Sequence, residues 1–268
     1  MNIEKAIDFV QRRGNIVENA RLSSILWNKP PPDKAMHELR KLQKSNGGFS
    51  FWMPGVSNLC DTAFILLWLD DLGVHKGKIA DPACQFILSK QQPDGGWDEV
   101  DEIAAFDPPE WMTPGRIETR IWLTGFCAHA LIRFGYAEAE GTTCPGDFLT
   151  KHMDDTGRLA GYFRATWIAL PMFSYYPGMN SEPFRKALIH VEANYSEEWQ
   201  GSYLTWLLRC LQDAKLPGDH PLVIRCLGDL TRKQRADGGW DSEDGSEHDV
   251  STTAEALRAY TLAKPNED

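Results

Sequence analysis

Acidic residues at the starts of predicted helices are the groups in this chain whose type and position could do chemistry. Asp61 lies in the stretch SNLCDTAFILLWLDD at 57–71, where Ser57 and Asn58 have the side chains of helix caps and an apolar run follows at 63–69. A neutral carboxylic acid held away from water can protonate an alkene as a general acid. A carboxyl at a helix N-terminus is otherwise stabilised as the anion and caps free backbone N–H groups. Asp61 therefore has two candidate roles, a cap and a proton donor.

Burial or a hydrogen-bonded partner must restore the neutral form of Asp61 if it is to donate a proton. We expect partners at the starts of other helices, namely Glu118 in RIETR and Asp249 in EHDVSTT. In a closed ring of helical hairpins these starts would converge on one mouth. The role of Asp61 thus depends on the elements that position these three acids.

Those elements are predicted by a repeated motif. The segments QKSNGGF from Gln43, QQPDGGW from Gln91 and QRADGGW from Gln234 share the order glutamine, three residues, two glycines and an aromatic. The first two glycine pairs are 48 residues apart, and the last follows 143 residues later. Degenerate copies at 154–163 and 197–204 fill that gap. A period in the forties is typical of stacked helical hairpins or propeller blades.

The segments between the repeats favour helices, because apolar residues recur at helical spacing and no sustained two-residue alternation occurs. We predict six hairpins, each with a polar first helix and a more apolar second helix. The first helices begin near 3, 33, 79, 144, 181 and 220, and the second helices near 17, 58, 117, 161, 201 and 249. Six buried helices inside six amphipathic ones make an all-α α6/α6 toroid, with residues 1–268 as a single domain. The glycine pair would turn the chain between outer and inner helix, and the glutamine would bond to the turn backbone.

At these residues the sequence resembles the squalene/terpene cyclase and protein prenyltransferase β-subunit superfamily. The glutamine-to-tryptophan copies resemble its repeats, and DTAFILLWL resembles the helix that carries the acid in its cyclases. The resemblance implies the toroid fold, with room for one barrel only. It also implies a reaction that acts on a prenyl chain, either cyclisation by an acid or prenyl transfer with zinc.

The acid motif of this superfamily matches the chain in part. The bacterial form, Asp-x-Asp-Asp-Thr-Ala, aligns with NLCDTA at 58–63, so Cys60 stands where the usual proton donor stands and Asp61 matches the next acid. In the last repeat, VSTTAEAL, Thr252 replaces the acid of the sterol-type form. The candidate catalytic residues are therefore Asp61, Cys60, Glu118 and Asp249.

Aromatic side chains on the inner helices are the candidate substrate-binding residues, because they would stabilise a carbocation by cation–π attraction. The members of this set are Trp68, Trp122, Tyr162, Phe163, Trp167, Tyr203 and Trp206. Plain core packing is the alternative role. Arg116, Arg120 and Arg164 could hold a diphosphate, or could pair with acids such as Glu118.

Two groups of residues have the side chains of a metal site. Cys144, Asp147 and His248 have the side chains of a prenyltransferase zinc site, but they do not match its inner-helix placement. The acid-rich loop WDSEDGSEHD at 240–249 could bind Mg²⁺ together with a diphosphate, or could be a solvated loop. We assign no metal ligand, and Mg²⁺ enters only if the substrate is a diphosphate.

The segment DEVDEIAAFDPPEWMTPG at 98–115 is long for a connection in a compact domain. Such connections are often lids or binding loops. With Phe106, Trp111 and Met112 it could cover the mouth of the barrel.

Composition limits the kind of partner. The formal charge of −10 argues against nucleic acid, and the longest apolar run is too short to span a bilayer, which leaves peripheral membrane contact open. The six cysteines form no C-x-x-C pair, and the N-terminus lacks the order of a secretory signal, so we expect a cytoplasmic protein.

The leading functional hypothesis is a terpene-cyclase-like isomerase of the protonation-initiated class. It would bind a hydrophobic isoprenoid, with or without a diphosphate, in an aromatic-lined barrel. Two alternatives remain. One is a non-catalytic relative that lost the acid and binds a lipid or a partner protein, and the other is a prenyltransferase-type transferase.

Overall fold

The computed structural model describes residues 1–138 and 144–263, and this part of the chain contains thirteen α-helices and no strand. The outer helices are α1 (Ile3–Arg13), α3 (Asp33–Leu42), α5 (Ala80–Ser89), α7 (Pro145–Lys151), α10 (Glu182–Ala193) and α12 (Pro221–Arg232). The inner helices are α2 (Ile16–Trp27), α4 (Leu59–Asp71), α6 (Ile117–Arg133), α8 (Ala165–Ile168), α9 (Leu170–Phe173), α11 (Gly201–Asp213) and α13 (Asp249–Ala263). Except in the fourth hairpin, every helix begins within one residue of its predicted start. Within the described residues, no helix is both long enough and apolar enough to cross a membrane.

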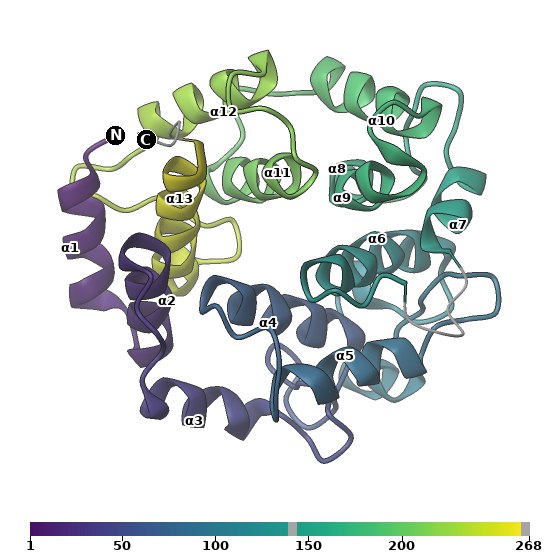
Figure 1. Ribbon diagram of the computed structural model, residues 1–268, viewed down its shortest axis with the longest axis horizontal. Coiled ribbons are helices and arrows are strands. Elements are labelled where there is room, and N and C mark those ends of the chain that lie inside the picture. The colour runs from purple at the N-terminus through teal and green to yellow at the C-terminus, as the bar shows by residue number, and fades with distance from the viewer. Residues whose placement is uncertain (139–143, 264–268) are drawn as a thin grey trace. The chain divides into compact units, whose positions relative to one another are not determined.

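The chain divides into two compact units, each with an inner and an outer row of helices. Unit 2 comprises Arg40–Asn194, and unit 1 joins Met1–Leu39 to Tyr195–Asp268. In unit 2, α4 packs on α6 and α6 on α8 and α9, while α5, α7 and α10 each pack on the inner helix that precedes them (Figure 1). In unit 1, α13 packs on both α11 and α2. The outer helix α1 packs on α13 in the same way as α5 packs on α4. The first hairpin therefore continues the series that ends with the last one.

The repeated turn links each outer helix to the inner helix that follows. The glutamine does bond to the turn backbone: Gln43 Nε2 donates to the carbonyls of Gly47 and Ile79 at 2.9 Å each. Gln234 makes the same pair of bonds to Gly238 and Asn2. The backbone N–H two residues after the first glycine donates to a threonine on the inner helix. These pairs are Phe49 with Thr62, Trp97 with Thr124, Leu159 with Thr166 and Trp240 with Thr253.

The first glycine of the turn is required by both conformation and space. Gly238 has φ of +96°, and a Cβ there would overlap with the carbonyl oxygen of Lys5 in the next outer helix. The second glycine, Gly239, lets the ring of Phe9 approach closely. The glycine pair is thus the surface on which the next hairpin packs, as well as a point where the chain turns.

The fourth hairpin departs from the prediction at its inner helix. A helix was expected from about 161, but α8 begins at Ala165 and ends at Ile168, and α9 resumes at Leu170. Pro171 explains the break, because proline has no N–H to donate to the carbonyl four residues earlier and its ring clashes with that carbonyl.

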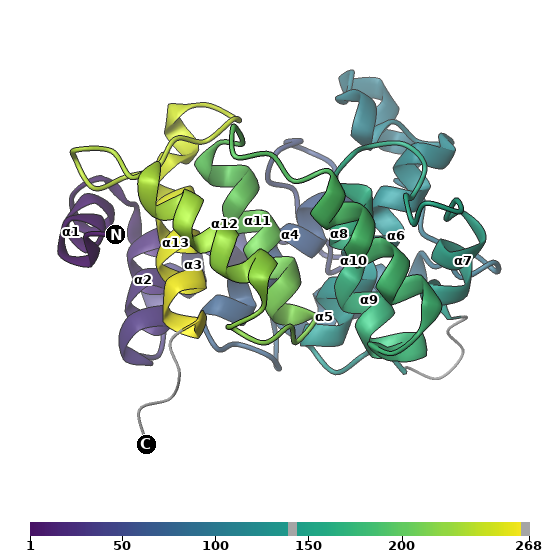
Figure 2. The same cartoon turned by 90° about the horizontal axis from the view of Figure 1, so that it is seen from above.

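The long segment at 98–115 contains two short 3₁₀ helices, η1 (Asp101–Phe106) and η2 (Glu110–Met112). Figure 2 shows it projecting from unit 2 near the start of α6. Met112 is buried and Phe106 exposed, and the Trp111 ring meets Trp122 of α6 edge to face at 6.3 Å. Its role as a lid stays a prediction.

Candidate functional site

The N-terminus of α4 is capped by residues other than Asp61. Asn58 is the N-cap, and its Oδ1 accepts the N–H of Asp61 at 2.7 Å. Glu99 accepts the two preceding N–H groups, from Leu59 at 2.7 Å and from Cys60 at 3.1 Å. The N–H groups of the first turn are thus occupied, so the capping role considered for the Asp61 carboxyl is not the one the structure gives it.

The Asp61 carboxyl faces the turn at 51–53 with one of its two oxygens. Oδ2 accepts the backbone N–H groups of Phe51, Trp52 and Met53 at 2.6, 3.1 and 3.3 Å, and the amide of Asn58 at 2.8 Å. Oδ1 is buried, and no hydrogen-bond partner for it exists among the described residues. All four donors therefore fall on one oxygen, and the other oxygen is left for a proton.

Burial sets the acidity of this carboxyl. The Asp61 side chain is fully buried, and loss of hydration raises its pKa, although the N–H groups on Oδ2 and the Asn58 amide act in the opposite direction. A carboxyl at a helix start was expected to ionise readily, but here desolvation has the larger effect. The structure thus supplies the burial that a neutral acid requires.

Glu99 is a buried acid that the sequence analysis did not identify. It is 4% exposed, and desolvation raises its pKa to about 7, with the charge of Asp61 as a lesser cause. Its Oε1 also accepts the N–H of Val100 at 3.0 Å, so both of its oxygens are engaged by backbone N–H groups. Glu99 lies 40 residues from Leu59 in the chain, and no local pattern marks the pairing.

An aromatic cluster adjoins Asp61. The ring of Phe51, whose N–H bonds to Asp61, lies 5.9 Å from Phe64 and 5.3 Å from Trp68. Trp52 lies 5.9 Å from Phe64. These centroid distances are those of interacting rings. Trp68 was predicted to bind substrate, whereas Phe51, Trp52 and Phe64 were not singled out. Phe51 and Trp52 come next to Asp61 only because the turn before α4 folds back onto its carboxyl.

The other predicted aromatics divide by burial. In unit 2, Trp122 and Trp167 are buried, Tyr162 is half-buried and Phe163 is exposed at 53%. The indole N–H of Trp122 is buried without a hydrogen-bond partner among the described residues. In unit 1, Tyr203 and Trp206 are half-buried on α11. Whether these residues contact a substrate stays a prediction.

The two acids expected to assist Asp61 have other contacts. Glu118 lies 3.7 Å from Arg116 and its Cβ packs against Gly161. Asp249, in unit 1, is paired with Arg235 and accepts the N–H of Ser242. Thr253 donates to the carbonyl of Asp249 as Thr62 donates to that of Asn58, so Asp249 is equivalent in the repeat to Asn58 and not to Asp61. The role of Asp249 in catalysis stays a prediction.

Cys60 has the wrong chemistry for a proton donor to an alkene. Burial, assisted by the charges of Asp61 and Glu99, raises the pKa of its thiol well above the usual range. It therefore remains a neutral thiol, a much weaker acid than a carboxyl.

The predicted diphosphate-binding arginines already have partners. Arg116 pairs with Glu110 and Glu118, which is the structural alternative named for it. Arg120 holds both oxygens of Asp94 at 2.8 Å. Arg164 lies over the ring of Phe163 at 5.6 Å. Their binding of a diphosphate stays a prediction.

In the acid-rich loop at 240–249, two carboxylates already have a cationic partner. Arg235 pairs with both Asp241 and Asp249 of this loop. Within residues 1–138 and 144–263, no three His, Cys, Asp or Glu side chains are grouped so as to hold a metal ion, and this includes Cys144, Asp147 and His248.

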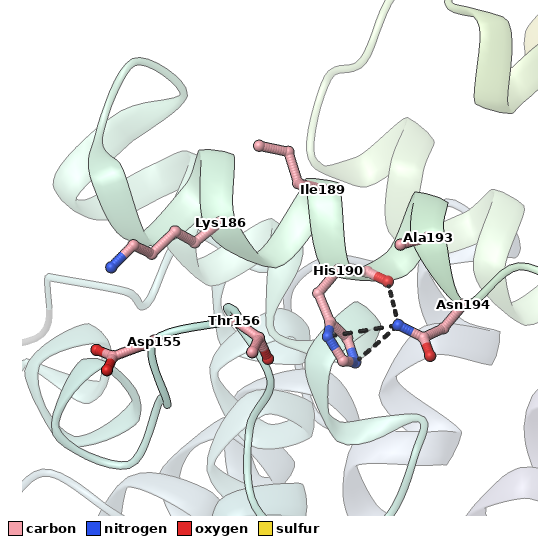
Figure 3. Close-up of a pocket in the computed structure, with 7 residues that line it drawn as sticks. All are labelled: Asp155, Thr156, Lys186, Ile189, His190, Ala193 and Asn194. Carbon is pink, nitrogen blue, oxygen red and sulfur yellow. Dashed lines mark hydrogen bonds between the residues drawn. The ribbon is translucent and has the colours of Figure 1, made fainter.

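A surface hollow lies at the degenerate turn of the fourth hairpin, in unit 2. Its lining residues are Asp155, Thr156, Lys186, Ile189, His190, Ala193 and Asn194. Figure 3 shows His190 of α10 beside the turn residue Thr156, and Asn194, which caps α10, next to His190. In the last repeat, the two glycines of the turn lie against Lys5 and Phe9 of α1, which are four residues apart. In the fourth hairpin, Gly157 lies against Lys186, His190 stands four residues later in place of the aromatic, and Arg158 replaces the second glycine. The hollow is therefore a position where the aromatic-on-glycine contact of the other turns is missing.

Solved structures match this chain over nearly its whole length. The type II terpene cyclase MstE from Scytonema, in its apo form, is 14% identical, covers 97% of this chain and 96% of its own, and has a TM-score of 0.66. A protein from Actinoplanes is 18% identical over 98% of each chain, with a TM-score of 0.64. The fold is that of a type II terpene cyclase.

The helical toroid predicted from the repeats is thereby confirmed as the fold class. An MstE variant in complex with its substrate, geranylgeranyl dihydroxybenzoate, matches with a TM-score of 0.64 and 14% identity, over 97% of this chain and 96% of that one. No protein-family model matches the sequence, and no curated protein does. At these identities the terpene cyclase fold is shared, and the reaction must be argued from the residues.

Proposed function

We propose that this protein is a terpene-cyclase-like isomerase in which Asp61 protonates a prenyl chain. One observation carries the proposal: every donor to the Asp61 carboxyl lies on Oδ2, so the proton of the neutral acid resides on Oδ1. No acceptor among the described residues competes for that proton. An alkene is a poor proton acceptor, so a proton without a stronger acceptor nearby favours its protonation.

The reaction conserves atoms and charge. The Oδ1–H bond of Asp61 breaks, and the proton forms a C–H bond at one end of an alkene. The resulting carbocation is attacked by further alkenes, which forms carbon–carbon bonds. The final cation loses a proton from carbon, so the product is an isomer of the substrate.

The aromatic cluster of Phe51, Trp52, Phe64 and Trp68 supports this reaction. Ring faces stabilise a nearby cation electrostatically, most strongly where water is excluded. MstE has been solved with a substrate that carries a geranylgeranyl chain on an aromatic acid. We therefore propose a polyprenyl chain as the reacting part of the substrate. A diphosphate is not required, and Mg²⁺ would take part only if one is present.

The test is turnover in D₂O with a panel of prenylated aromatic acids, prenyl diphosphates and squalene. Asp61 exchanges its proton with solvent, so each turnover should place one deuteron on the product and release one proton from carbon. The product should be one mass unit heavier than the substrate and contain fewer alkenes by NMR. Asp61→Asn should lower turnover by at least about 100-fold, the contribution of a general acid.

Asp71→Asn is the matched control, because Asp71 is also buried on α4 but lies roughly 15 Å along the helix from Asp61 at 1.5 Å per residue. This variant should retain turnover. Activity that survives in Asp61→Asn would remove Asp61 as the acid. If the wild-type protein instead binds an isoprenoid and forms no product, the lipid-binding alternative replaces the cyclase.

A further inference from the structure

Glu99 and Asp61 differ in how their oxygens are used. In Glu99, Oε1 accepts two backbone N–H groups and Oε2 accepts one, so a proton on either oxygen would face a backbone donor. In Asp61, Oδ2 accepts all four donors and Oδ1 accepts none from the described residues. Ionised Glu99 keeps every one of its hydrogen bonds, and neutral Asp61 keeps every one of its own.

The two carboxyls also act on each other through charge. Both are buried at the start of α4, and ionisation of Asp61 raises the pKa of Glu99. Their two negative charges repel each other, whichever carboxyl ionises first. The pair therefore resists carrying two charges at once.

We propose that Glu99 is a positioning residue, which takes the single negative charge of this carboxyl pair and thereby leaves the proton on Asp61. Glu99 also occupies the N–H groups of Leu59 and Cys60, whose positive helix end would otherwise stabilise an Asp61 anion. The assignment deepens the proposed function and rests on it for its catalytic meaning. The order in which the two acids ionise is independent of any substrate.

The remaining groups around Glu99 do not alter this assignment. From α4 it faces Asp61 and the Cys60 thiol, and from α6 it faces the Cys127 thiol. Burial raises the pKa of both thiols well above the usual range, so neither thiol ionises near neutrality. On its own segment, Asp98 Oδ1 accepts the Glu99 N–H at 2.8 Å. Asp61 is thus the partner with which Glu99 exchanges charge.

The test is a pH titration of carboxyl ¹³C signals in protein labelled at Asp and Glu, without substrate. The signals are assigned by their loss in Asp61→Asn and Glu99→Gln. Glu99 should ionise first and Asp61 should remain protonated beyond it. In Glu99→Gln the Asp61 pKa should fall by at least about one unit, because a neighbouring charge is removed. In Glu99→Asp, which restores the charge, it should return toward the wild-type value.

Ionisation of Asp61 before Glu99 in the wild-type protein overturns the proposal. If turnover is observed, its loss at high pH should shift to lower pH in Glu99→Gln by the same amount as the Asp61 pKa. If Glu99 had only a structural role, Glu99→Gln would lower the rate but would leave unchanged the pH at which turnover is lost. A correct order of ionisation in a protein without turnover would refute the isomerase and leave the charge assignment intact.

Discussion

Burial without a cationic partner distinguishes Asp61 and Glu99 from Glu118 and Asp249. Asp61 is fully buried and Glu99 is 4% exposed, whereas Glu118 is partly exposed and paired with an arginine. A carboxyl that is desolvated without a cationic partner keeps its proton to higher pH. All three side chains are carboxyls, so the environment alone separates a buried acid from an exposed ion pair.

The raised pKa of Glu99 predicts how stability depends on pH. Its pKa is about 7 in the folded protein against 4.5 for the ordinary side chain, so the unfolded chain releases the proton first. This contribution to stability is complete below pH 4.5 and is lost as pH rises through 7. The loss amounts to about 3 kcal/mol for a difference of about 2.5 pKa units.

Urea unfolding of the wild-type protein and Glu99→Gln between pH 4.5 and 8 measures this effect. The difference in unfolding free energy between them should change by about 3 kcal/mol over that range, in favour of the variant at high pH. A constant difference would mean that Glu99 is ionised in the folded protein throughout.

The repeated turn is the element that sets the positions of the inner helices. The glutamine bonds within the turn and to the start of the next outer helix, the glycine pair packs against the next hairpin, and the threonine joins the turn to the inner helix. The copy of this turn that precedes α4 is followed directly by Phe51, Trp52 and Met53, whose N–H groups donate to Asp61. The structural repeat thus carries the donors that orient the acid.

Gly238→Ala tests the packing role of the turn, with Gly77→Ala as its control. Both glycines have similar φ, +96° and +98°, but a Cβ at Gly238 would overlap with Lys5, whereas nothing lies within 4 Å of one at Gly77. Both variants pay about 1–3 kcal/mol of backbone strain, and only Gly238→Ala must also displace the next helix. We expect a lower melting temperature for Gly238→Ala than for Gly77→Ala. Equal melting temperatures would show that conformation alone requires the glycine.

A buried ion network connects the first hairpin with the last two in unit 1. Glu255 of α13 pairs with Arg21 of α2 and, at 3.3 Å, with Arg209 of α11. Asp213 accepts from Arg258 at 2.9 Å and lies 3.6 Å from Arg209. Arg21 and Arg209 have almost no exposed side-chain surface. Segments more than 200 residues apart are thus joined by desolvated charges.

Glu255→Gln should destabilise unit 1, because it removes a carboxylate from between two buried arginines. Breaking such a buried pair typically costs about 3–5 kcal/mol. Glu182→Gln, in the exposed pair of Glu182 with Lys186 in unit 2, is the matched control and should cost less than about 1 kcal/mol. Hydrogen exchange should accelerate in α2, α11 and α13 for the first variant. Acceleration spread equally over α4 and α6 would contradict a network confined to unit 1.

The turns and helices could be predicted because their causes are local. Gln43, Gly47 and Gly48 are neighbours in sequence, and an apolar helix such as α4 is evident from its own residues. The single-domain assignment and the cytoplasmic location remain predictions. The broken fourth inner helix was missed although Pro171 was visible, because the apolar pattern on both sides of it favoured one continuous helix.

The sequence by itself determined the repeat, the order of the hairpins, the fold class and Asp61 as the acid to follow. Only the tertiary structure decided that Asn58 and Glu99 cap α4, that the donors to Asp61 all fall on Oδ2, and that Asp249 belongs to a different position of the repeat. The physical reason is that the protonation state of a carboxyl depends on burial and on the partners of each oxygen. In this chain those partners include residues 40 positions away, which only folding brings to the start of α4.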